Sequence, residues 1–379
     1  MKRRTFLKCL GCGTAAAATS HTGLLPEFLG GVQNAWAFDY AKELARVEAR
    51  FYTKLDEGGI ECGICPRHCR ITDLERGYCG VRENRGDTYY SLVYGLPCSL
   101  NIDPIEKKPL FHFLPGTTAF SLATAGCNVN CKFCQNWEIS QQRPEQTNNI
   151  ELSPGRAVEV CREKKVPTIA YTYSEPIVFY EYMYDIAEEG HRHGIRSAMI
   201  TGGYIEREPL AALLPHLDAV KVDLKAIRES FYRDIVDGHL APVLDALVQI
   251  KQSGVWLEIV YLVVPTLNDT DQEFRELAQW LKANLGLDTP IHFTRFHPQY
   301  LLTNLPPTPV ATMERAREIA LAEGLEYVYL GNVPGHSAES TYCPQCGALL
   351  IERRGYHTRV VGLSDHRCRE CQRTIPGVF

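Results

Sequence analysis

The sequence predicts an α/β protein built on a partial (β/α)6-type barrel, with a cysteine-rich domain before the barrel and a short metal-binding tail after it. Three observations lead to this prediction. Short apolar runs alternate with helical patterns between residues 117 and 336. Sets of closely spaced cysteines lie before, within and after that region. The chain has 379 residues, which is long enough for two or three domains with a substantial core.

Composition argues against several classes of protein. Apolar residues make up 45% and charged residues 22%, which is ordinary globular usage rather than disorder, collagen or coiled coil. The net charge of −5 argues against nucleic acid or an anionic membrane surface as the main partner. No stretch reaches the roughly 18 apolar residues of a transmembrane helix. The 15 cysteines suggest metal sites, because a disulfide scaffold is typical of much shorter chains.

Residues 1–37 are predicted to be a targeting segment. The first eight residues are rich in lysine and arginine, a weakly apolar run follows, and Ala35-Trp36-Ala37 offers a small-residue cleavage site. The string KRRTFLK is similar to the twin-arginine export signal, which carries folded proteins with their cofactors. An unprocessed basic arm is the alternative.

Residues 39–116 are predicted to form the cysteine-rich domain. Its four cysteines are closely spaced, and His68 lies among them. Four thiolates suit a zinc ion or a 4Fe–4S cluster equally well in number. The spacing differs from that of ferredoxins, so a structural zinc site is the hypothesis and a second cluster the alternative. The set consists of Cys62, Cys65, Cys69 and Cys79.

Seven apolar runs, rich in Val, Ile, Tyr and Thr, are predicted as barrel strands. Their near-continuous apolarity is typical of parallel strands that are buried on both faces. Strand–helix repeats of this kind form either an open doubly wound sheet or a barrel. Six or seven units in about 220 residues favour a partial barrel over one with eight strands. The runs are Phe120–Thr124, Thr168–Tyr173, Ser197–Thr201, Ala219–Leu224, Trp256–Val263, Ile291–Phe296 and Tyr327–Leu330.

The intervening helices have recognisable ends. Ser153 before Pro154 is predicted to be an N-cap, and Thr270 forms a capping box with Glu273. Three glycines stand where helices should end in the left-handed conformation, namely Gly194, Gly254 and Gly324. Cys98 and Cys161, outside every close-spaced set, are expected to be buried as small apolar side chains.

The central cysteines follow the first predicted barrel strand. Ligands of such sheets bind at the carboxyl ends of the strands, so this loop belongs to the expected site. Cys127, Cys131 and Cys134 offer three thiolates, and no further cysteine or histidine is near them in the sequence. A structural zinc site has four protein ligands. Three thiolates instead suit a 4Fe–4S cluster with one iron left open for a substrate or cofactor.

The spacing C-x3-C-x2-C, with Phe133 before its last cysteine, resembles the radical S-adenosylmethionine (radical SAM) superfamily. The strings CKFCQNWEIS, AYTYSEPIVFYEY, KVDLK, VVPTLND, FHP and YLGNVPGH are similar to one branch of it. That branch is the radical SAM member of the AmmeMemoRadiSam system, which is related to pyruvate formate-lyase activating enzymes. The resemblance covers about residues 60–350.

The resemblance implies that Cys127, Cys131 and Cys134 ligate the cluster and that its open iron binds S-adenosylmethionine. A low-potential donor of the flavodoxin or ferredoxin type would provide an electron, and a 5′-deoxyadenosyl radical would abstract hydrogen from a protein or small organic substrate. Memo-like and Ammecr-like proteins are the implied partners. The signal segment suggests export to the periplasm or a membrane face, whereas the need for S-adenosylmethionine favours the cytoplasm.

The resemblance also implies cofactor-binding residues at the strand ends. Glu175 occupies the place of the superfamily's Gly-Gly-Glu segment, although both preceding glycines are absent. Asp223 and Lys225 match an Asp-Leu-Lys segment whose lysine contacts the methionine carboxylate. His297 is similar to a histidine near the adenosine. A barrel-rim salt bridge or a helix cap is the alternative for each of these four residues.

Gly202 and Gly203 follow the third predicted barrel strand. We assign them to the cofactor site because of this position, at the edge of the sheet where ligands bind. Plain turn glycines are the alternative.

The tail, residues 341–379, carries two C-x2-C pairs separated by 21 residues. This spacing is close to that of a zinc ribbon. A segment this short cannot build an unaided core, so a metal is expected to contribute its folding energy. Zinc is favoured over a rubredoxin-like iron. Nothing both basic and aromatic surrounds the ribbon, so nucleic-acid binding is not expected. The predicted ligands are Cys343, Cys346, Cys368 and Cys371.

The leading functional hypothesis is a radical SAM enzyme with an unknown substrate. A glycyl-radical activating enzyme is the alternative within the same chemistry. A non-catalytic iron–sulfur electron carrier or metal-trafficking protein is the alternative of another class, and it predicts clusters ligated entirely by protein.

Overall fold

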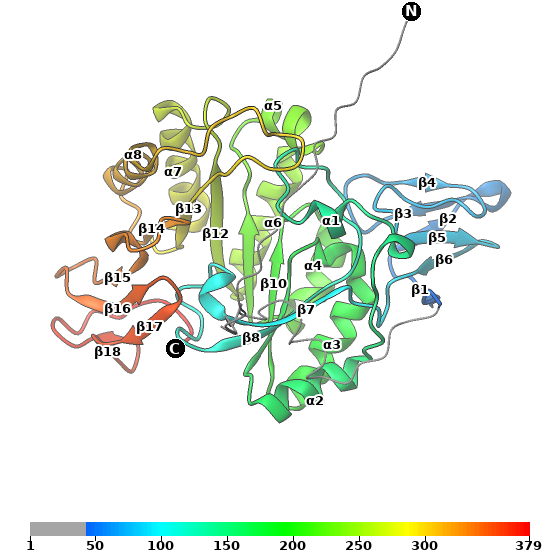
Figure 1. Ribbon diagram of the computed structural model, residues 1–379, viewed down its shortest axis with the longest axis horizontal. Coiled ribbons are helices and arrows are strands. Elements are labelled where there is room, and N and C mark those ends of the chain that lie inside the picture. Colours follow the sequence, from blue (N-terminus) through cyan, green and yellow to red (C-terminus); the bar gives the residue numbers. More distant parts are fainter. Residues whose placement is uncertain (1–42) are drawn as a thin grey trace, which may run out of the picture. The chain divides into compact units, whose positions relative to one another are not determined.

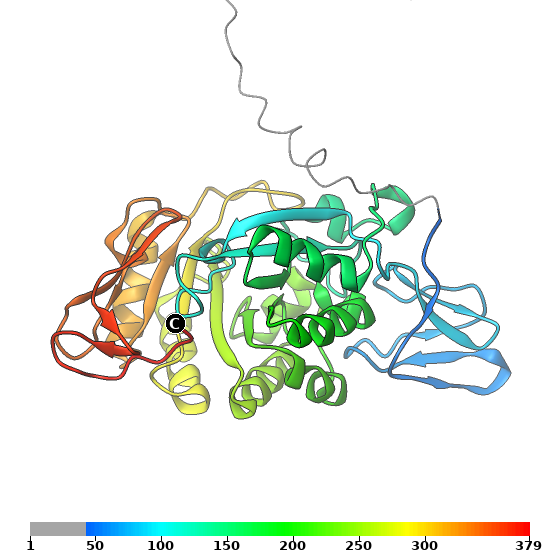
Figure 2. The same cartoon turned by 90° about the horizontal axis from the view of Figure 1, so that it is seen from below.

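One eight-stranded sheet forms the wall of an open barrel (Figures 1 and 2). The structure, a computed structural model, describes residues 43–379, so the predicted signal segment at residues 1–37 lies outside the described residues. The strand order is β14-β13-β12-β11-β10-β9-β8-β7. The parallel strands therefore follow the order of the chain, whereas a doubly wound sheet reverses its order at a switch point. The barrel alternative is the one that the structure supports.

All seven predicted barrel strands are present, with ends within two residues of the prediction, and they pair in parallel. There is one parallel strand more than a six-stranded barrel has. The strands are β8 (Thr118–Ala123), β9 (Thr168–Tyr171), β10 (Arg196–Thr201), β11 (Ala219–Asp223), β12 (Trp256–Val263), β13 (Ile291–Arg295) and β14 (Val328–Gly331).

The eighth strand, β7 (Ser99–Pro104), was not predicted, because its sequence ends in proline and its side chains are mostly half-buried, as is usual at a sheet edge. It pairs antiparallel with β8. Residues 99–104 therefore belong to the barrel sheet, although the sequence places them in the cysteine-rich domain. The chain then turns into the barrel, where Ile105, Leu110 and Phe113 pack on small alanines of β8 to β11.

Helices cover the outer face of the sheet (Figure 1). The longer ones are α2 (Pro154–Lys164), α3 (Tyr180–Arg192), α4 (Arg207–Leu213), α6 (Leu240–Ser253), α7 (Asp271–Leu285) and α8 (Val310–Ala322). The short ones are η2 (Asp56–Gly58), η3 (Ile105–Lys107), α1 (Trp137–Ser140), η4 (Pro144–Gln146), η5 (Pro176–Phe179), η6 (Leu214–His216), α5 (Glu229–Phe231), the π-helix η7 (Tyr232–Val236) and η8 (Ser337–Glu339). Within residues 43–379, no helix combines the length and apolarity needed to cross a bilayer.

The predicted helix ends are confirmed with one exception. Ser153 caps α2, and Gly194, Gly254 and Gly324 all have positive φ where α3, α6 and α8 end. Thr270 also caps α7, accepting a hydrogen bond from the Glu273 backbone at 3.2 Å. The Glu273 side chain does not complete a capping box, because it turns into the core and accepts a hydrogen bond from the Tyr261 hydroxyl at 2.8 Å.

The cysteine-rich segment forms two small three-stranded sheets on the side of the barrel opposite the tail (Figures 1 and 2). A buried ion pair joins it to the barrel helices: Arg82 lies 2.5 Å from Glu181 of α3. Both side chains are almost fully buried, so each charge depends on the other for compensation. The strands are β1 (Val47–Glu48), β2 (Tyr52–Lys54), β3 (Ile60–Cys62), β4 (Arg70–Ile71), β5 (Arg82–Arg85) and β6 (Thr88–Ser91).

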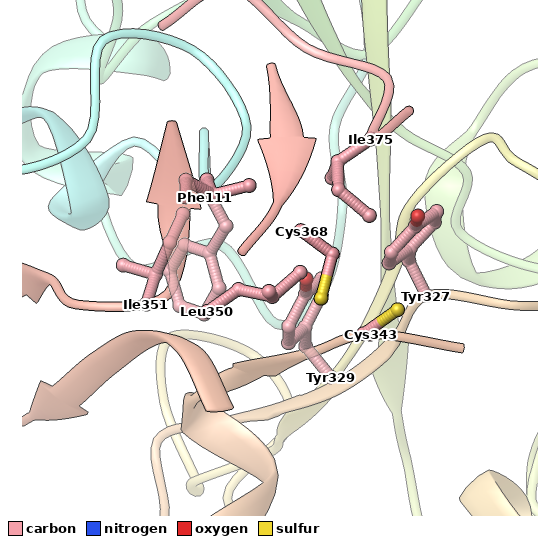
Figure 3. Close-up of a cluster of buried hydrophobic side chains, with 9 residues drawn as sticks. Phe111, Tyr327, Tyr329, Cys343, Leu350, Ile351, Cys368 and Ile375 are labelled. Carbon is pink, nitrogen blue, oxygen red and sulfur yellow. The ribbon is translucent and has the colours of Figure 1, made fainter. Parts of the chain in front are cut away.

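The tail packs on the last barrel strand. Figure 3 shows Leu350 and Ile351 of the tail gathered with Tyr327, Tyr329 and Phe111 in one buried cluster. The tail strands are β15 (Thr341–Tyr342), β16 (Leu349–Arg354), β17 (His357–Val360), β18 (Leu363–Ser364) and β19 (Arg367–Cys368). The described residues, 43–379, all belong to one compact unit, so the tail is part of the body that contains the barrel.

The four tail cysteines converge on one point. Their sulfur atoms all lie within 4.8 Å of one another, with Cys343 and Cys371 3.5 Å apart and Cys346 and Cys368 3.7 Å apart. Four sulfurs about 2.3 Å from a tetrahedral zinc ion lie about 3.8 Å apart, so the set fits such an ion. All the cysteines among the described residues are free, which is inconsistent with a disulfide scaffold. Of the two remaining cysteines, Cys161 is buried as expected and Cys98 is half-buried.

Inside the barrel, a carboxylate ties the strands to the segment that fills them. Glu258 of β12 is fully buried and accepts hydrogen bonds from the backbone of Phe111 and His112 at 2.9 and 2.8 Å. It also accepts hydrogen bonds from Trp256 and His292 at 3.0 and 2.7 Å. Burial opposes its ionisation, but these donors outweigh burial and lower the pKa of Glu258 to about 2.

Replacing Glu258 with alanine is expected to lower the free energy of unfolding by about 3–5 kcal/mol, because its buried donors lose their acceptor. Urea denaturation followed by circular dichroism measures the change. Glu159→Ala, on an exposed face of α2, is the control and should change the value by less than about 0.5 kcal/mol. Because the folded pKa is depressed, the Glu258 contribution is present above about pH 4.5 and is lost as pH falls toward 2. Similar losses in the two variants would contradict the role given to Glu258.

We expect the purified chain to hold one zinc ion in the tail, and Cys346→Ser to release it, because a tetrahedral site needs all four thiolates. Metal analysis by mass spectrometry measures the zinc content, and limited proteolysis should then cut within residues 341–379. Cys98→Ser, outside the cysteine sets, is the control. Iron in place of zinc, or full zinc content in the Cys346 variant, would contradict this assignment.

Candidate metal-cluster and cofactor site

The central cysteines lie on a loop at the carboxyl end of β8, as the sequence predicts. The loop is fixed by the segments that follow β10 and β11. Asn128 donates a hydrogen bond to the backbone carbonyl of Tyr204 at 2.7 Å, and the Lys132 backbone donates to Ile235 at 2.9 Å. Ile235 belongs to η7, a π-helix, which is a rare element that is enriched at functional sites.

The three thiols face one another. Cys127 interacts electrostatically with Cys131 and Cys134, and the Cys134 sulfur lies 3.2 Å from the Ser140 hydroxyl. Burial raises the pKa of the Cys131 thiol to about 12, although nearby Lys225 acts in the opposite direction. Thiols buried in this way ionise at neutral pH only beside a cation. A metal centre provides that cation, so the donor set fits an iron–sulfur cluster.

The three thiols are also less closely grouped than those of the tail. Among residues 43–379, only the tail set brings three or more metal-binding side chains within 4.8 Å of one another. A cluster of four irons spreads its ligands more widely than one tetrahedral ion does. The spacing of Cys127, Cys131 and Cys134 therefore fits a cluster better than zinc.

Glu175 follows β9 and is 4% exposed. Its carboxylate accepts hydrogen bonds from the Thr201 hydroxyl at 2.6 Å and from the Gly202 backbone at 2.8 Å. Burial raises its pKa, and these donors only partly offset that effect. Glu175 interacts electrostatically with both Cys127 and Lys225, so it lies beside the cysteine loop with its charge incompletely compensated.

Two lysines flank one carboxylate at the end of β11. Lys225 lies 3.1 Å from Asp223, and Lys221 is bonded to the other oxygen of the same carboxylate. Burial opposes ionisation of Asp223, but the two lysines outweigh it and lower the pKa of Asp223 to about 2. Burial lowers the pKa of Lys221, against the opposing effect of Asp223. Lys225 reaches to 5.9 Å from the centre of the Phe133 ring in the cysteine loop.

The remaining predicted cofactor-site residues are Gly202, Gly203 and His297, and the glycines differ from the histidine in their surroundings. Gly202 holds Glu175 through its backbone, and Gly203 has a φ of 73° and faces Val222 and Val243, where a side chain would be crowded. These glycines therefore shape the turn that positions Glu175. His297 follows β13 as predicted, and its side chain is exposed.

The sequence reasoning missed several buried polar residues in the barrel. Lys221 and Thr201 support Asp223 and Glu175, as described above. Deeper in the barrel, Lys108 lies 2.6 Å from Asp103 and 4.4 Å from the centre of the Tyr173 ring, and Tyr173 has a φ of 65°. The lysine within the apolar run of β11 was a visible signal for Lys221. No local signal reveals the Asp103 cluster, because its members come from β7, η3 and the loop after β9.

The cysteines of the first set also come together. Cys62, Cys65, Cys69 and Cys79 line a single cavity, and Asn128 of the central cysteine loop lines it with them. Burial raises the pKa of the Cys65 thiol to about 12.

Comparisons with known proteins agree with this geometry. Residues 121–281 match the model of the radical SAM superfamily. An uncharacterized protein of Methanocaldococcus jannaschii is 48% identical over 330 residues, which cover 86% of this chain and 98% of that protein. The pyruvate formate-lyase-activating enzyme of Clostridium pasteurianum is 26% identical over 160 residues, covering 41% of this chain and 66% of the enzyme.

Among solved structures, a radical SAM methyltransferase of Sphaerobacter thermophilus aligns with 60% of this chain and 71% of its own, at 19% identity and a TM-score of 0.45. The family match spans β8 to α7 and so includes the cysteine loop, Glu175, Asp223 and Lys225. The chain belongs to the radical SAM superfamily, and it is an enzyme related to the pyruvate formate-lyase activating enzymes.

Proposed function

We propose that Cys127, Cys131 and Cys134 bind a 4Fe–4S cluster and that the enzyme cleaves S-adenosylmethionine reductively to abstract hydrogen from a protein or small organic substrate. The observation that carries the proposal is the meeting of these three widely spaced thiols with Glu175 and Lys225 at the mouth of the barrel. When bound, the cluster supplies the single electron that breaks a C–S bond of S-adenosylmethionine. A low-potential donor of the flavodoxin or ferredoxin type would deliver that electron.

Glu175 is suited to hold the methionine amine. Thr201 donates to one of its carboxylate oxygens and Gly202 to the other, so its orientation is set before a ligand arrives. Each carboxylate oxygen has more than one acceptor position, so an ammonium group can still bind. Burial raises the pKa of Glu175, and a cation beside it would offset this effect and stabilise the ionised form.

Lys225 is suited to hold the methionine carboxylate. Asp223 can neutralise only one of its two lysine partners, so the group has one positive charge left for an anion. A charge-assisted hydrogen bond of this kind is stronger than a neutral one, more so in a buried site. Lys225 also interacts with Cys131, so both proposed contacts to the ligand would lie beside the cysteine loop.

We place the enzyme in an AmmeMemoRadiSam-type system, with Memo-like and Ammecr-like proteins as partners, because CKFCQNWEIS and AYTYSEPIVFYEY resemble that branch. The similarity to pyruvate formate-lyase activating enzymes supports a second candidate, the activation of a glycyl-radical protein. The two candidates differ in product. A glycyl-radical activase leaves a stable protein radical that electron paramagnetic resonance detects on its partner, whereas the first candidate leaves a covalent mass change on a partner or metabolite.

The reconstituted enzyme is expected to produce 5′-deoxyadenosine from S-adenosylmethionine under anaerobic reduction, and Cys131→Ala should abolish the product because three thiolates are needed to hold the cluster. Liquid chromatography with mass spectrometry measures the product. Cys98→Ala is the matched control and should retain the activity. Lack of product from the unchanged chain, where a known radical SAM enzyme is active, would contradict the proposed function.

Glu175→Gln is expected to weaken binding of S-adenosylmethionine by about 10- to 100-fold, because a charged hydrogen bond to the amine is lost. Lys225→Met should weaken it by a similar factor. The change in the electron paramagnetic resonance spectrum of the reduced cluster on titration gives Kd without turnover. Glu159→Gln, far from the site on α2, is the control. Unchanged affinity in both site variants would show that these residues do not hold the methionine group.

A further inference from the structure

The cysteine set of residues 62–79 forms a site of its own. Cys62 ends β3, Cys65 and Cys69 lie in the loop that follows, and Cys79 precedes β5. The four thiols line one cavity, and Cys65 interacts electrostatically with each of the other three. This convergence of residues that are up to 17 positions apart in sequence indicates a metal centre.

We propose that this set binds a second 4Fe–4S cluster, which passes electrons to the cluster held by Cys127, Cys131 and Cys134. The zinc hypothesis fits the tail, where pairs of sulfurs lie 3.5 and 3.7 Å apart. Cys62, Cys65, Cys69 and Cys79 are less closely grouped, because among residues 43–379 the tail set alone brings three or more such ligand atoms within 4.8 Å of one another. They share this wider spacing with the central cysteines, and a four-iron cluster accounts for it.

The surroundings of the four thiols favour a negatively charged cluster. Arg82 is 1% exposed and interacts electrostatically with Cys62 and Cys79. The Tyr78 backbone donates a hydrogen bond to the Cys69 sulfur at 3.4 Å, and the Tyr89 hydroxyl is hydrogen-bonded to Cys62. The Arg82 charge is shared with Glu181, so the donors aimed at sulfur are what stabilise the thiolates and tune the potential of such a cluster.

The two cysteine sets are in direct contact through the backbone. Gly126, which precedes Cys127, packs so closely on Cys79 that an added Cβ would lie 2.8 Å from the Cys79 carbonyl oxygen. Asn128 lines the cavity of the first set, and Arg67 donates a hydrogen bond to its carbonyl oxygen. The residues on either side of Cys127 therefore touch the first set, which leaves a short path for an electron between the two centres.

The transfer involves one electron and no change in bonding. A low-potential flavodoxin- or ferredoxin-type donor is oxidised by one electron, the second cluster is reduced by it, and the second cluster is then reoxidised by the central one. No proton or leaving group moves. This role rests on the proposed function, whereas the presence of the second cluster does not.

The variant Cys127→Ala/Cys131→Ala/Cys134→Ala, isolated without oxygen, tests the cluster independently of any reaction. We expect about four irons and four sulfides per chain, against about eight of each in the unchanged chain. Dithionite should produce a reduced-cluster signal in electron paramagnetic resonance that S-adenosylmethionine does not alter. Zinc bound in the first set in place of iron, or iron without sulfide, would overturn the proposal.

If the triple variant fails to fold, the complementary variant Cys65→Ser/Cys69→Ser tests the same proposal. It should retain about four irons and a signal that S-adenosylmethionine does alter, while Cys98→Ser retains about eight. Stopped-flow absorbance should then show at least tenfold slower reduction of the central cluster by reduced flavodoxin in Cys65→Ser/Cys69→Ser than in Cys98→Ser. Equal rates would overturn the role in electron transfer, and about eight irons in the double variant would overturn the site.

Discussion

Seven barrel strands pair in parallel and in chain order, and this pairing decides where the site residues lie. Because β8 to β14 all run in one direction, their carboxyl ends meet at one edge of the sheet. Residues separated by about a hundred positions, such as Cys127 and Lys225, are brought together there. Strands β11 to β13 of this sheet carry buried charged side chains as well as apolar ones. These charges must then be compensated inside the protein.

Each of these buried charges is paired with polar groups from neighbouring segments. Glu258 is paired with His292 and backbone donors, Asp223 with two lysines, and Asp103 with Lys108. Each arrangement satisfies a group that would otherwise be costly to bury. Glu175 and Lys225 differ from the rest in position, because both interact with the cysteine loop. That position is why we propose that they hold the amine and the carboxylate of one ligand.

The three cysteine sets differ more clearly in the spacing of their thiols than in the number of cysteines they contain. The tail set is compact enough for one tetrahedral ion. The central set and the set at residues 62–79 are wider, and they lie against each other through Gly126 and Asn128. The tail is attached at the opposite side of the barrel, next to β14 (Figures 1 and 2). A metal bound there would therefore contribute to stability, whereas we propose that the other two sets act together.

The seven parallel strands, most helix ends and the central cysteine motif can be predicted from the sequence, because periodicity, caps and ligand spacing are local properties. Glu175 and Lys225 follow their strands as predicted, and Asp223 ends β11. The folded structure was needed to show that β7 joins the barrel sheet, that Glu273 turns inward and that Thr201 holds Glu175. Those features depend on contacts between segments that are distant in the sequence, and such contacts exist only in the folded protein. The distance between sulfurs is a property of the same kind, which is why the sequence left zinc and a cluster undecided for Cys62 and its partners.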